Sequence, residues 1–321
     1  MIKDYVVPLM LGHNPYFGVD HLSREEGNVK AARFEDAQRI ADMLLCCHDL
    51  GFRGMMMSTH PRAALVSEVI GRESLLSAVW RIYPLIPYIQ KYVRGANERG
   101  LVNMVKDTLS QASLSQKLLW MFEGSRGLLT KDIQAGLTML IDIEMLSFKG
   151  RRLGAIFLHD ALTDLALGMG VEAVLDVFRD HVWEKYQVPA GFVTKNLPLL
   201  RERLSQRGWT ELLAMASFNA QGFMVNPSLE ECAAAISRPG MTFVAMNTLA
   251  GGAIPPERAY QYLAGFPSIH SVVVGVSRRD HATETVKMIK HYLPLASESQ
   301  LSNLASVQAG GQDRDLASVA S

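Results

Sequence analysis

The sequence predicts an α/β protein built as one closed (β/α)8 TIM barrel. The chain has 321 residues, of which 48% are apolar and 20% charged. That length is ordinary for such a barrel, and that composition excludes a disordered chain. Eight short runs with apolar interiors alternate with amphipathic stretches along the chain. Apolar runs of this kind are typical of parallel strands buried on both faces, and eight strand–helix units are the number that closes a barrel.

The first part of the chain supplies three of these units. Strands are predicted at the apolar runs 6–11, 54–58 and 79–86. Helices are predicted at 34–49 and 62–76. The first helix has apolar residues at helical spacing, and Gly51 follows it, where helices commonly end.

The second part supplies five more units. Strands are predicted at 153–159, 189–194, 212–218, 241–247 and 270–277. Each is followed by an amphipathic stretch, and these predict helices at 171–185, 197–207, 228–237, 256–264 and 279–292. The alternation continues without a break, which favours a single barrel domain over residues 1–296.

Two segments fall outside the repeated unit. Residues 88–136 predict a helical insertion between strands three and four, rich in aromatic and methionine side chains such as Trp120 and Met121. We expect this insertion to cover the barrel mouth or to form a subunit contact, in which case the protein is a homo-oligomer. The tail 297–321 is polar and rich in Gly and Ser, which predicts a flexible C-terminus.

Charge and cysteine content indicate which kinds of binding partner and which cellular compartment to expect. Lys plus Arg and Asp plus Glu are both 32, so nothing indicates binding to nucleic acid or to an anionic membrane. The sequence has no long apolar run and no signal-peptide pattern. Its three cysteines do not form a disulfide framework. We therefore expect a cytoplasmic protein whose partner is a small molecule.

The fold class indicates where the chemistry should lie, because barrel enzymes place their active site at the C-terminal ends of the strands. Five candidate catalytic residues are expected there: His13, His60, Tyr83, His159 and Lys195. The three histidines with Asp160 could alternatively bind a divalent metal, although no common metal-binding spacing supports this. Lys195 could alternatively form a Schiff base.

An anion site is predicted after strands seven and eight, the usual phosphate site of this fold. Gly251 and Gly252 form a turn in which backbone N–H groups can approach a ligand closely. Ser277 can cap the next helix, and Arg278 and Arg279 stand beside it. We therefore expect a phosphorylated or otherwise anionic ligand.

Several segments resemble the aldo-keto reductase superfamily, over most of residues 5–290 apart from the insertion. They are LMLGHNPYFG (9–18), AIFLHD (155–160), GFVTKN (191–196), FNAQ (218–221), TLAGG (248–252) and SVVVGVSRRDHATET (271–285). The resemblance implies that His159 is the active-site histidine and that NADP(H) is the cofactor. It also implies cofactor contacts from Asn219, Ser277, Arg278 and Glu284.

The chain departs from the family's Asp-Tyr-Lys-His tetrad at three positions. Alignment without gaps from Gly51 places Met56 at the Asp position, Pro61 at the Tyr position, and Tyr83 or Leu85 near the Lys position. Only the histidine remains. The lost tyrosine is the family's proton donor, so the resemblance implies a divergent member with a substitute acid.

Three functional hypotheses remain open at this point. The first is an NADP(H)-dependent oxidoreductase acting on a small carbonyl or alcohol, with His159 and either His60 or Tyr83 handling the proton. The second is a non-redox lyase, isomerase, dehydratase or hydrolase, or a metal-dependent enzyme, that uses His13, His60, His159 and Lys195 on the same barrel. The third is a binding subunit without catalytic activity.

Overall fold

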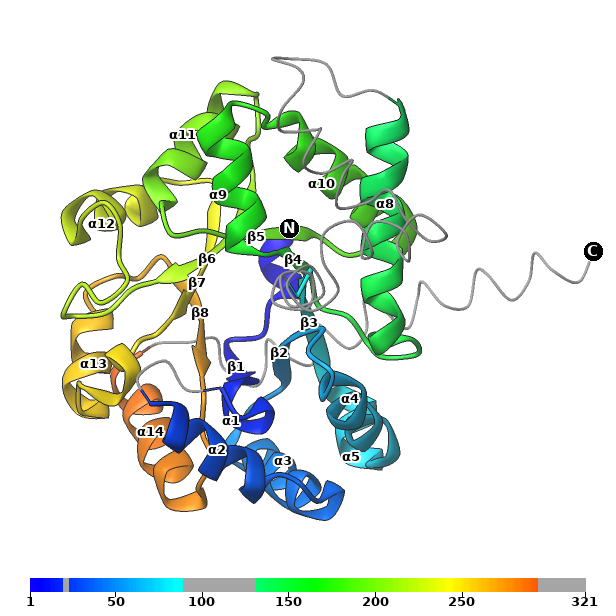
Figure 1. Cartoon of the computed structure of the whole chain (residues 1–321). Coiled ribbons are helices and arrows are strands. Elements are labelled where there is room, and N and C mark those ends of the chain that lie inside the picture. The colour runs from blue at the N-terminus through cyan, green and yellow to red at the C-terminus, as the bar shows by residue number, and fades with distance from the viewer. Residues whose placement is uncertain (20–22, 89–130, 294–321) are drawn as a thin grey trace, which may run out of the picture.

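The protein is described by a computed structural model that covers residues 1–19, 23–88 and 131–293. Its strands are β1 (Leu9–Gly12), β2 (Gly54–Ser58), β3 (Arg81–Ile86), β4 (Ile156–Leu158), β5 (Ala190–Val193), β6 (Leu212–Ser217), β7 (Met241–Met246) and β8 (Ile269–Val274). All eight run parallel in sequence order, and β8 pairs with β1 to close the barrel (Figure 1). The predicted fold class is confirmed.

The helices lie outside the barrel. They are α1 (Asn14–Phe17), α2 (Arg24–Arg33), α3 (Ala37–Leu50), α4 (Ala63–Arg72), α5 (Ser74–Val79), α8 (Lys131–Met145), α9 (Asp160–Met169), α10 (Ala173–Tyr186), α11 (Leu197–Gln206), α12 (Leu229–Ser237), α13 (Pro256–Leu263) and α14 (Arg279–Tyr292). Among the described residues, no helix combines the length and apolar character that crossing a membrane would need.

Most predicted elements are found within a few residues of their expected bounds. The helix predicted at 62–76 is divided at Glu73 into α4 and α5. Three further helices, α1, α2 and α9, were not predicted. Most of the predicted insertion lies outside the described residues, although its last part begins α8, and the tail 297–321 lies outside them too.

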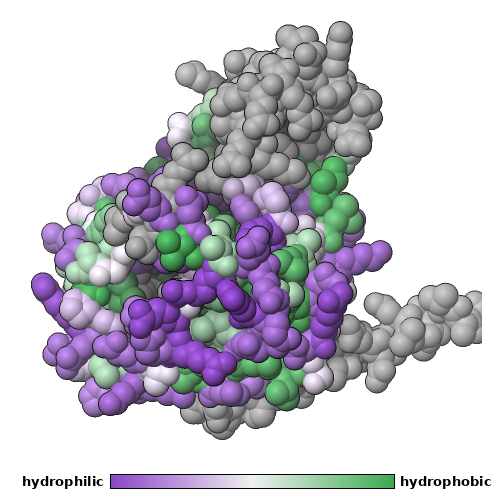
Figure 2. Space-filling model, turned by 60° about the horizontal axis from the view of Figure 1, so that its bottom comes forward, coloured by the Kyte–Doolittle hydropathy of each residue, from purple (hydrophilic) through white to green (hydrophobic). Residues whose placement is uncertain are grey.

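The core has two layers, as the period of two along each strand requires. Met10, Phe157 and Met215 belong to a smaller cluster that fills the barrel. Their strand neighbours join a larger cluster with the inner faces of the helices. On the face in Figure 2, hydrophilic side chains predominate and hydrophobic ones are scattered among them, as on most soluble domains.

Tyr83 lies deeper in the barrel than the sequence predicts. Strand β3 continues to Ile86, so Tyr83 is not at its end. The ring packs where Gly54 and Gly154 have no side chain, since an added Cβ would come within 2.7 and 2.3 Å of the ring. The Tyr83 hydroxyl donates to the Tyr5 carbonyl oxygen and accepts from the Val7 N–H, each at 2.9 Å.

Candidate active site

A cavity of about 1030 Å³ opens at the C-terminal ends of the strands. Each of the eight βα units contributes to its wall. One lining residue from each unit, in order, is His13, Ser58, Tyr88, His159, Lys195, Met224, Asn247 and Ser277. The predicted catalytic residues His13, His60, His159 and Lys195 all line this cavity. Tyr83 does not, because it lies one layer further down the barrel.

His13 and Ser58 form a buried pair between β1 and β2. The Nδ1 of His13 lies 3.1 Å from the Met56 carbonyl oxygen, and its Nε2 lies 3.3 Å from the Ser58 hydroxyl oxygen. A carbonyl oxygen can only accept a hydrogen bond, so Nδ1 carries a proton. In the neutral ring, Nε2 is then the acceptor for the Ser58 hydroxyl. Ser58 was not among the predicted site residues.

His60 belongs to an aromatic wall beside this pair. Its ring stacks on Phe17 with the centroids 4.9 Å apart, and meets the edge of Tyr88 at 5.2 Å. Nδ1 of His60 accepts a hydrogen bond from the Arg62 N–H at 3.2 Å. The neutral form of His60 therefore carries its proton on Nε2 and is a hydrogen-bond donor.

The loops that carry His60 and Tyr88 are held by Glu144 of α8. This carboxylate is buried and accepts hydrogen bonds from the Thr59 hydroxyl and, at 3.1 Å, from the Tyr88 N–H. Sequence reasoning missed Glu144, because nothing local relates it to residues 56 and 85 positions away. Its role is to position the rim of the cavity.

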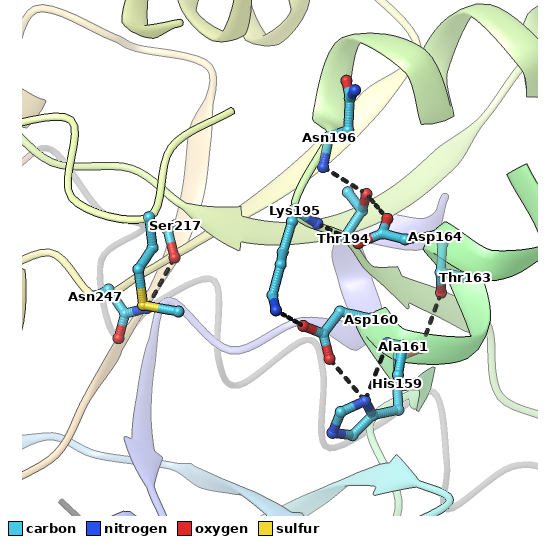
Figure 3. A network of polar contacts seen from close by, with 11 residues as sticks. His159, Asp160, Ala161, Thr163, Asp164, Thr194, Lys195, Asn196, Ser217 and Asn247 are labelled. Atoms are coloured by element: carbon cyan, nitrogen blue, oxygen red, sulfur yellow. Dashed lines mark hydrogen bonds and ion pairs between the residues drawn. The ribbon is translucent and has the colours of Figure 1, made fainter. Parts of the chain in front are cut away.

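His159, Asp160 and Lys195 form a chain of polar contacts along the opposite rim (Figure 3). Asp160 Oδ1 lies 2.6 Å from His159 Nδ1, and Asp160 Oδ2 lies 3.6 Å from Lys195 Nζ. Burial alone would raise the pKa of Asp160. The hydrogen bond from His159 and the charges of His159 and Lys195 outweigh burial and lower that pKa overall. Asp160 is therefore held as the carboxylate.

The backbone that carries Lys195 is fixed by a second carboxylate of α9. Asp164 accepts hydrogen bonds from the Thr194 hydroxyl and, at 2.9 Å, from the Lys195 N–H (Figure 3). Burial raises the pKa of Asp164 despite these bonds. Sequence reasoning missed Asp164 because α9 itself was not predicted.

The glycine turn after β7 is open toward the cavity. Gly251 and Gly252 line the cavity and adopt φ angles of 71° and 98°, a backbone conformation that favours glycine. A Cβ added at Gly252 would have no neighbour within 4 Å. The turn therefore leaves room for a ligand close to its backbone.

The strand-eight end of the predicted anion site differs from the prediction. Ser277 lines the cavity but does not cap α14, because the N-cap residue is Arg278, which makes no side-chain capping bond. Arg278 also lines the cavity, and its guanidinium is ion-paired with Asp280. Glu284 lines the cavity, whereas Arg279 does not.

Asn219 is not placed where the resemblance implied a cofactor contact. It is fully buried, and its amide bonds to Gln221 N–H and to both backbone groups of Phe223. These bonds shape the loop after β6, and Asn219 does not line the cavity. The amide that does line it is Asn247, which donates to the Ser217 hydroxyl oxygen at 2.7 Å (Figure 3).

The metal alternative finds no donor set in residues 1–19, 23–88 and 131–293. Over these residues, no three His, Cys, Asp or Glu side chains are grouped so that they could hold a metal ion. His13, His60 and His159 line one cavity without forming such a group.

Comparison with known proteins places the fold. No protein-family model and no curated protein sequence matches this chain. Among solved structures, one assigned to the aldo-keto reductases, from Pseudomonas aeruginosa, is similar with a TM-score of 0.56 at 14% identity, covering 89% of this chain and 90% of that one. An aldo-keto reductase from Bacillus halodurans in its holo form gives 0.52 at 11% identity, with 92% and 91% covered.

A third similar structure is assigned as a 2,5-diketo-D-gluconic acid reductase B. Its TM-score is 0.52 at 10% identity, with 95% of this chain and 93% of that one covered. The likeness therefore extends over almost the whole barrel. At such low identities it establishes the fold that this chain shares with aldo-keto reductases.

Proposed function

We propose that this chain is a divergent aldo-keto-reductase-like oxidoreductase that uses NADP(H) and acts on a small carbonyl or alcohol. One observation carries the proposal. A single cavity runs from the open glycine turn at Gly251–Gly252 to the rim that holds His60 and His159. A cofactor and a substrate bound together in this cavity could therefore contact both the anion site and the candidate proton donors.

The residues present fit a dinucleotide. The cavity volume, about 1030 Å³, stands at the upper end of the range for cofactor and small-molecule sites, roughly 300–1000 Å³. The backbone at Gly252 is open, and Gly275 and Ser277 also line the cavity. These groups would hold the phosphates. When bound, a reduced nicotinamide would supply a hydride, which is one proton with two electrons, to the carbonyl carbon.

His159 is the proposed proton donor to the carbonyl oxygen. In the protonated imidazole, the Nδ1–H donates to the Asp160 carboxylate at 2.6 Å, which leaves the Nε2–H to be donated to the substrate. After transfer the proton is on the substrate oxygen and His159 is neutral. The His159 side chain is 25% exposed, so solvent can return a proton to it.

His60 and the apolar wall complete the arrangement. The Nε2–H of neutral His60 is a second donor that can orient the carbonyl oxygen. Met56, at the lost Asp position, and Leu85, one of the two residues near the lost Lys position, line the cavity with apolar surface. Apolar side chains there exclude water and strengthen the polar contacts that remain.

Non-redox acid–base chemistry is the second candidate function. Its support is that His13, His60, His159 and Lys195 line the same cavity. Its Schiff-base version is disfavoured, because Lys195 is 56% exposed and lies beside Asp160, whereas Schiff-base lysines are desolvated in apolar surroundings.

The test is a titration of the purified protein with NADPH, followed by the fluorescence of the nicotinamide. We expect saturable binding in the micromolar range, and oxidation of bound NADPH when small aldehydes and ketones are supplied. Absence of binding at millimolar NADPH would end the redox proposal and leave acid–base chemistry at the histidines. A protein that binds NADPH but turns over no carbonyl substrate would favour the binding-subunit hypothesis.

A further inference from the structure

Helix α2, which is additional to the eight strand–helix units of the barrel, contributes two cationic side chains to the cavity. Lys30 and Arg33, near its C-terminal end, both line the cavity beside Ser277. The helix was not predicted, and neither cation was among the candidate binding residues. Helix α2 contacts α1 and extends toward α14 (Figure 1).

Contacts on both sides fix this helix. Gly18, at a φ of +71°, packs so closely that an added Cβ would lie 2.6 Å from the Ala31 side chain. Arg62, from the loop after β2, donates to the carbonyl oxygens of Ala31 and Phe34. Arg33 donates to the Ser277 carbonyl oxygen at 3.2 Å. The backbone that carries Lys30 and Arg33 is therefore held in place by tertiary contacts.

The cation at the start of α14 is already compensated. Arg278 donates from Nε to Asp280 at 3.0 Å and makes a second bond to the other carboxylate oxygen. The Arg278 hydrogen bond lowers the pKa of Asp280 to about 2, and the His281 N–H bonds to the same carboxylate. Asp280 thus neutralises Arg278 and faces the first turn of α14. Glu284 adds another carboxylate to this wall.

We infer that Lys30 and Arg33 bind the 2′-phosphate of the cofactor and so set a preference for NADP(H) over NAD(H). This inference rests on the proposed function. A phosphate monoester carries a charge of about −1.5 to −2 at neutral pH, which two cations balance. The planar guanidinium suits phosphate oxygens, and the contact of Arg33 with Ser277 uses one of its five N–H donors.

The experiment measures dissociation constants for NADPH and NADH with the full-length chain. The test variant is Lys30→Ala/Arg33→Ala. The charge-matched control is Arg39→Ala/Lys287→Ala, whose exposed cations do not line the cavity. We expect NADPH binding to weaken about 10-fold to 100-fold in the test variant only. Unchanged NADH binding would show that this variant is folded.

Two further measurements sharpen the test. Adenosine 2′,5′-bisphosphate should compete with NADPH in the wild type and lose affinity in the test variant, whereas 5′-AMP should show no such loss. Arg33→Lys should retain part of the NADPH preference, because lysine keeps the positive charge but lacks the paired N–H donors of the guanidinium.

Equal weakening of NADPH and NADH in the test variant, or no weakening at all, would overturn the inference. Loss of the NADPH preference in Arg278→Ala/Asp280→Ala would also overturn the inference, since it would show that residues at the start of α14 recognise the 2′-phosphate. Failure of the wild type to bind either dinucleotide would instead overturn the proposed function itself.

Discussion

His159 has two hydrogen-bonding partners that require opposite protonation of one ring nitrogen. Its Nδ1 lies 3.2 Å from the Ala161 N–H, which needs an acceptor, and 2.6 Å from the Asp160 carboxylate, which needs a donor. A neutral ring with its proton on Nε2 satisfies the first contact, and any ring with a proton on Nδ1 satisfies the second. When protonated His159 gives up its Nε2 proton, the Nδ1–H toward Asp160 is kept, so the carboxylate orients the ring before and after the transfer, which suits a general acid.

At this residue we predict that His159→Gln lowers kcat for carbonyl reduction by about 10²-fold to 10⁴-fold, the usual contribution of a general acid. Glutamine can still accept from the Ala161 N–H, so the loop should stay in place and the dissociation constant of NADPH should not change. His291→Gln, at the exposed end of α14, is the matched control. Steady-state kinetics with unchanged turnover in His159→Gln would exclude His159 as the acid.

The site could be predicted from the sequence only for residues that directly follow a strand. His13, His60, His159 and Lys195 follow apolar runs, and all four reach the cavity. Tyr83 did not, because it lies three residues before Ile86, the last residue of both the predicted strand and β3, and three residues along a strand correspond to about 10 Å.

The supporting carboxylates could not be predicted, because their partners are distant in the sequence. Glu144 bonds to Thr59 across 85 positions, and Asp164 bonds to Thr194 across 30. Burial makes such bonds necessary, but no local pattern indicates which polar groups will meet.

At the scale of elements, helix α2 could not be predicted from the sequence, because tertiary contacts maintain it. Helix α2 is polar along most of its length, so it has no apolar stripe to detect. It is held instead by the close approach of Ala31 to Gly18 and by Arg62. Helix α9 has an apolar face and ends at Gly170, which are signals that the sequence does contain.

The carboxylate of Asp142 connects helix α8 to α10 by hydrogen bonds. Asp142 of α8 accepts from His181 Nε2 at 2.9 Å, from Lys185 Nζ at 2.7 Å and from the Tyr186 hydroxyl at 2.7 Å. Burial alone would raise the pKa of Asp142. The bonds from Lys185, His181 and Tyr186 outweigh burial and lower it overall. The junction also fixes the helix that carries Glu144.

We predict that Asp142→Asn lowers the free energy of unfolding at pH 7 by about 1–2 kcal/mol, the range for hydrogen bonds to a partly exposed charged group. Because the pKa of Asp142 is lowered in the folded state, its contribution is present above the unfolded value of 3.8 and is lost as pH falls through the folded pKa. Urea unfolding between about pH 7 and pH 3 should show wild type and variant converging at the acid end. A constant difference across that range would contradict this account.

At the scale of the whole molecule, the cavity depends on the closed barrel. Its wall takes residues from all eight βα units, and β8 must pair with β1 to bring His13 and Ser277 to the same cavity. The barrel and the cavity therefore form together, and the unfolded chain has no such site. A ligand that binds there should stabilise the entire domain rather than one region of it.

We predict that NADPH raises the thermal unfolding midpoint as a single cooperative transition. At 100 times the dissociation constant, a ligand that binds only the folded state contributes about 2.7 kcal/mol. With an unfolding entropy of about 2.1 cal/mol/K per residue, a domain of this size should shift by about 4 °C. Differential scanning calorimetry with and without NADPH measures it, and Lys30→Ala/Arg33→Ala should shift less at the same concentration. Two separate transitions, with only one of them moving, would show that the cavity forms in part of the chain and not with the barrel as a whole.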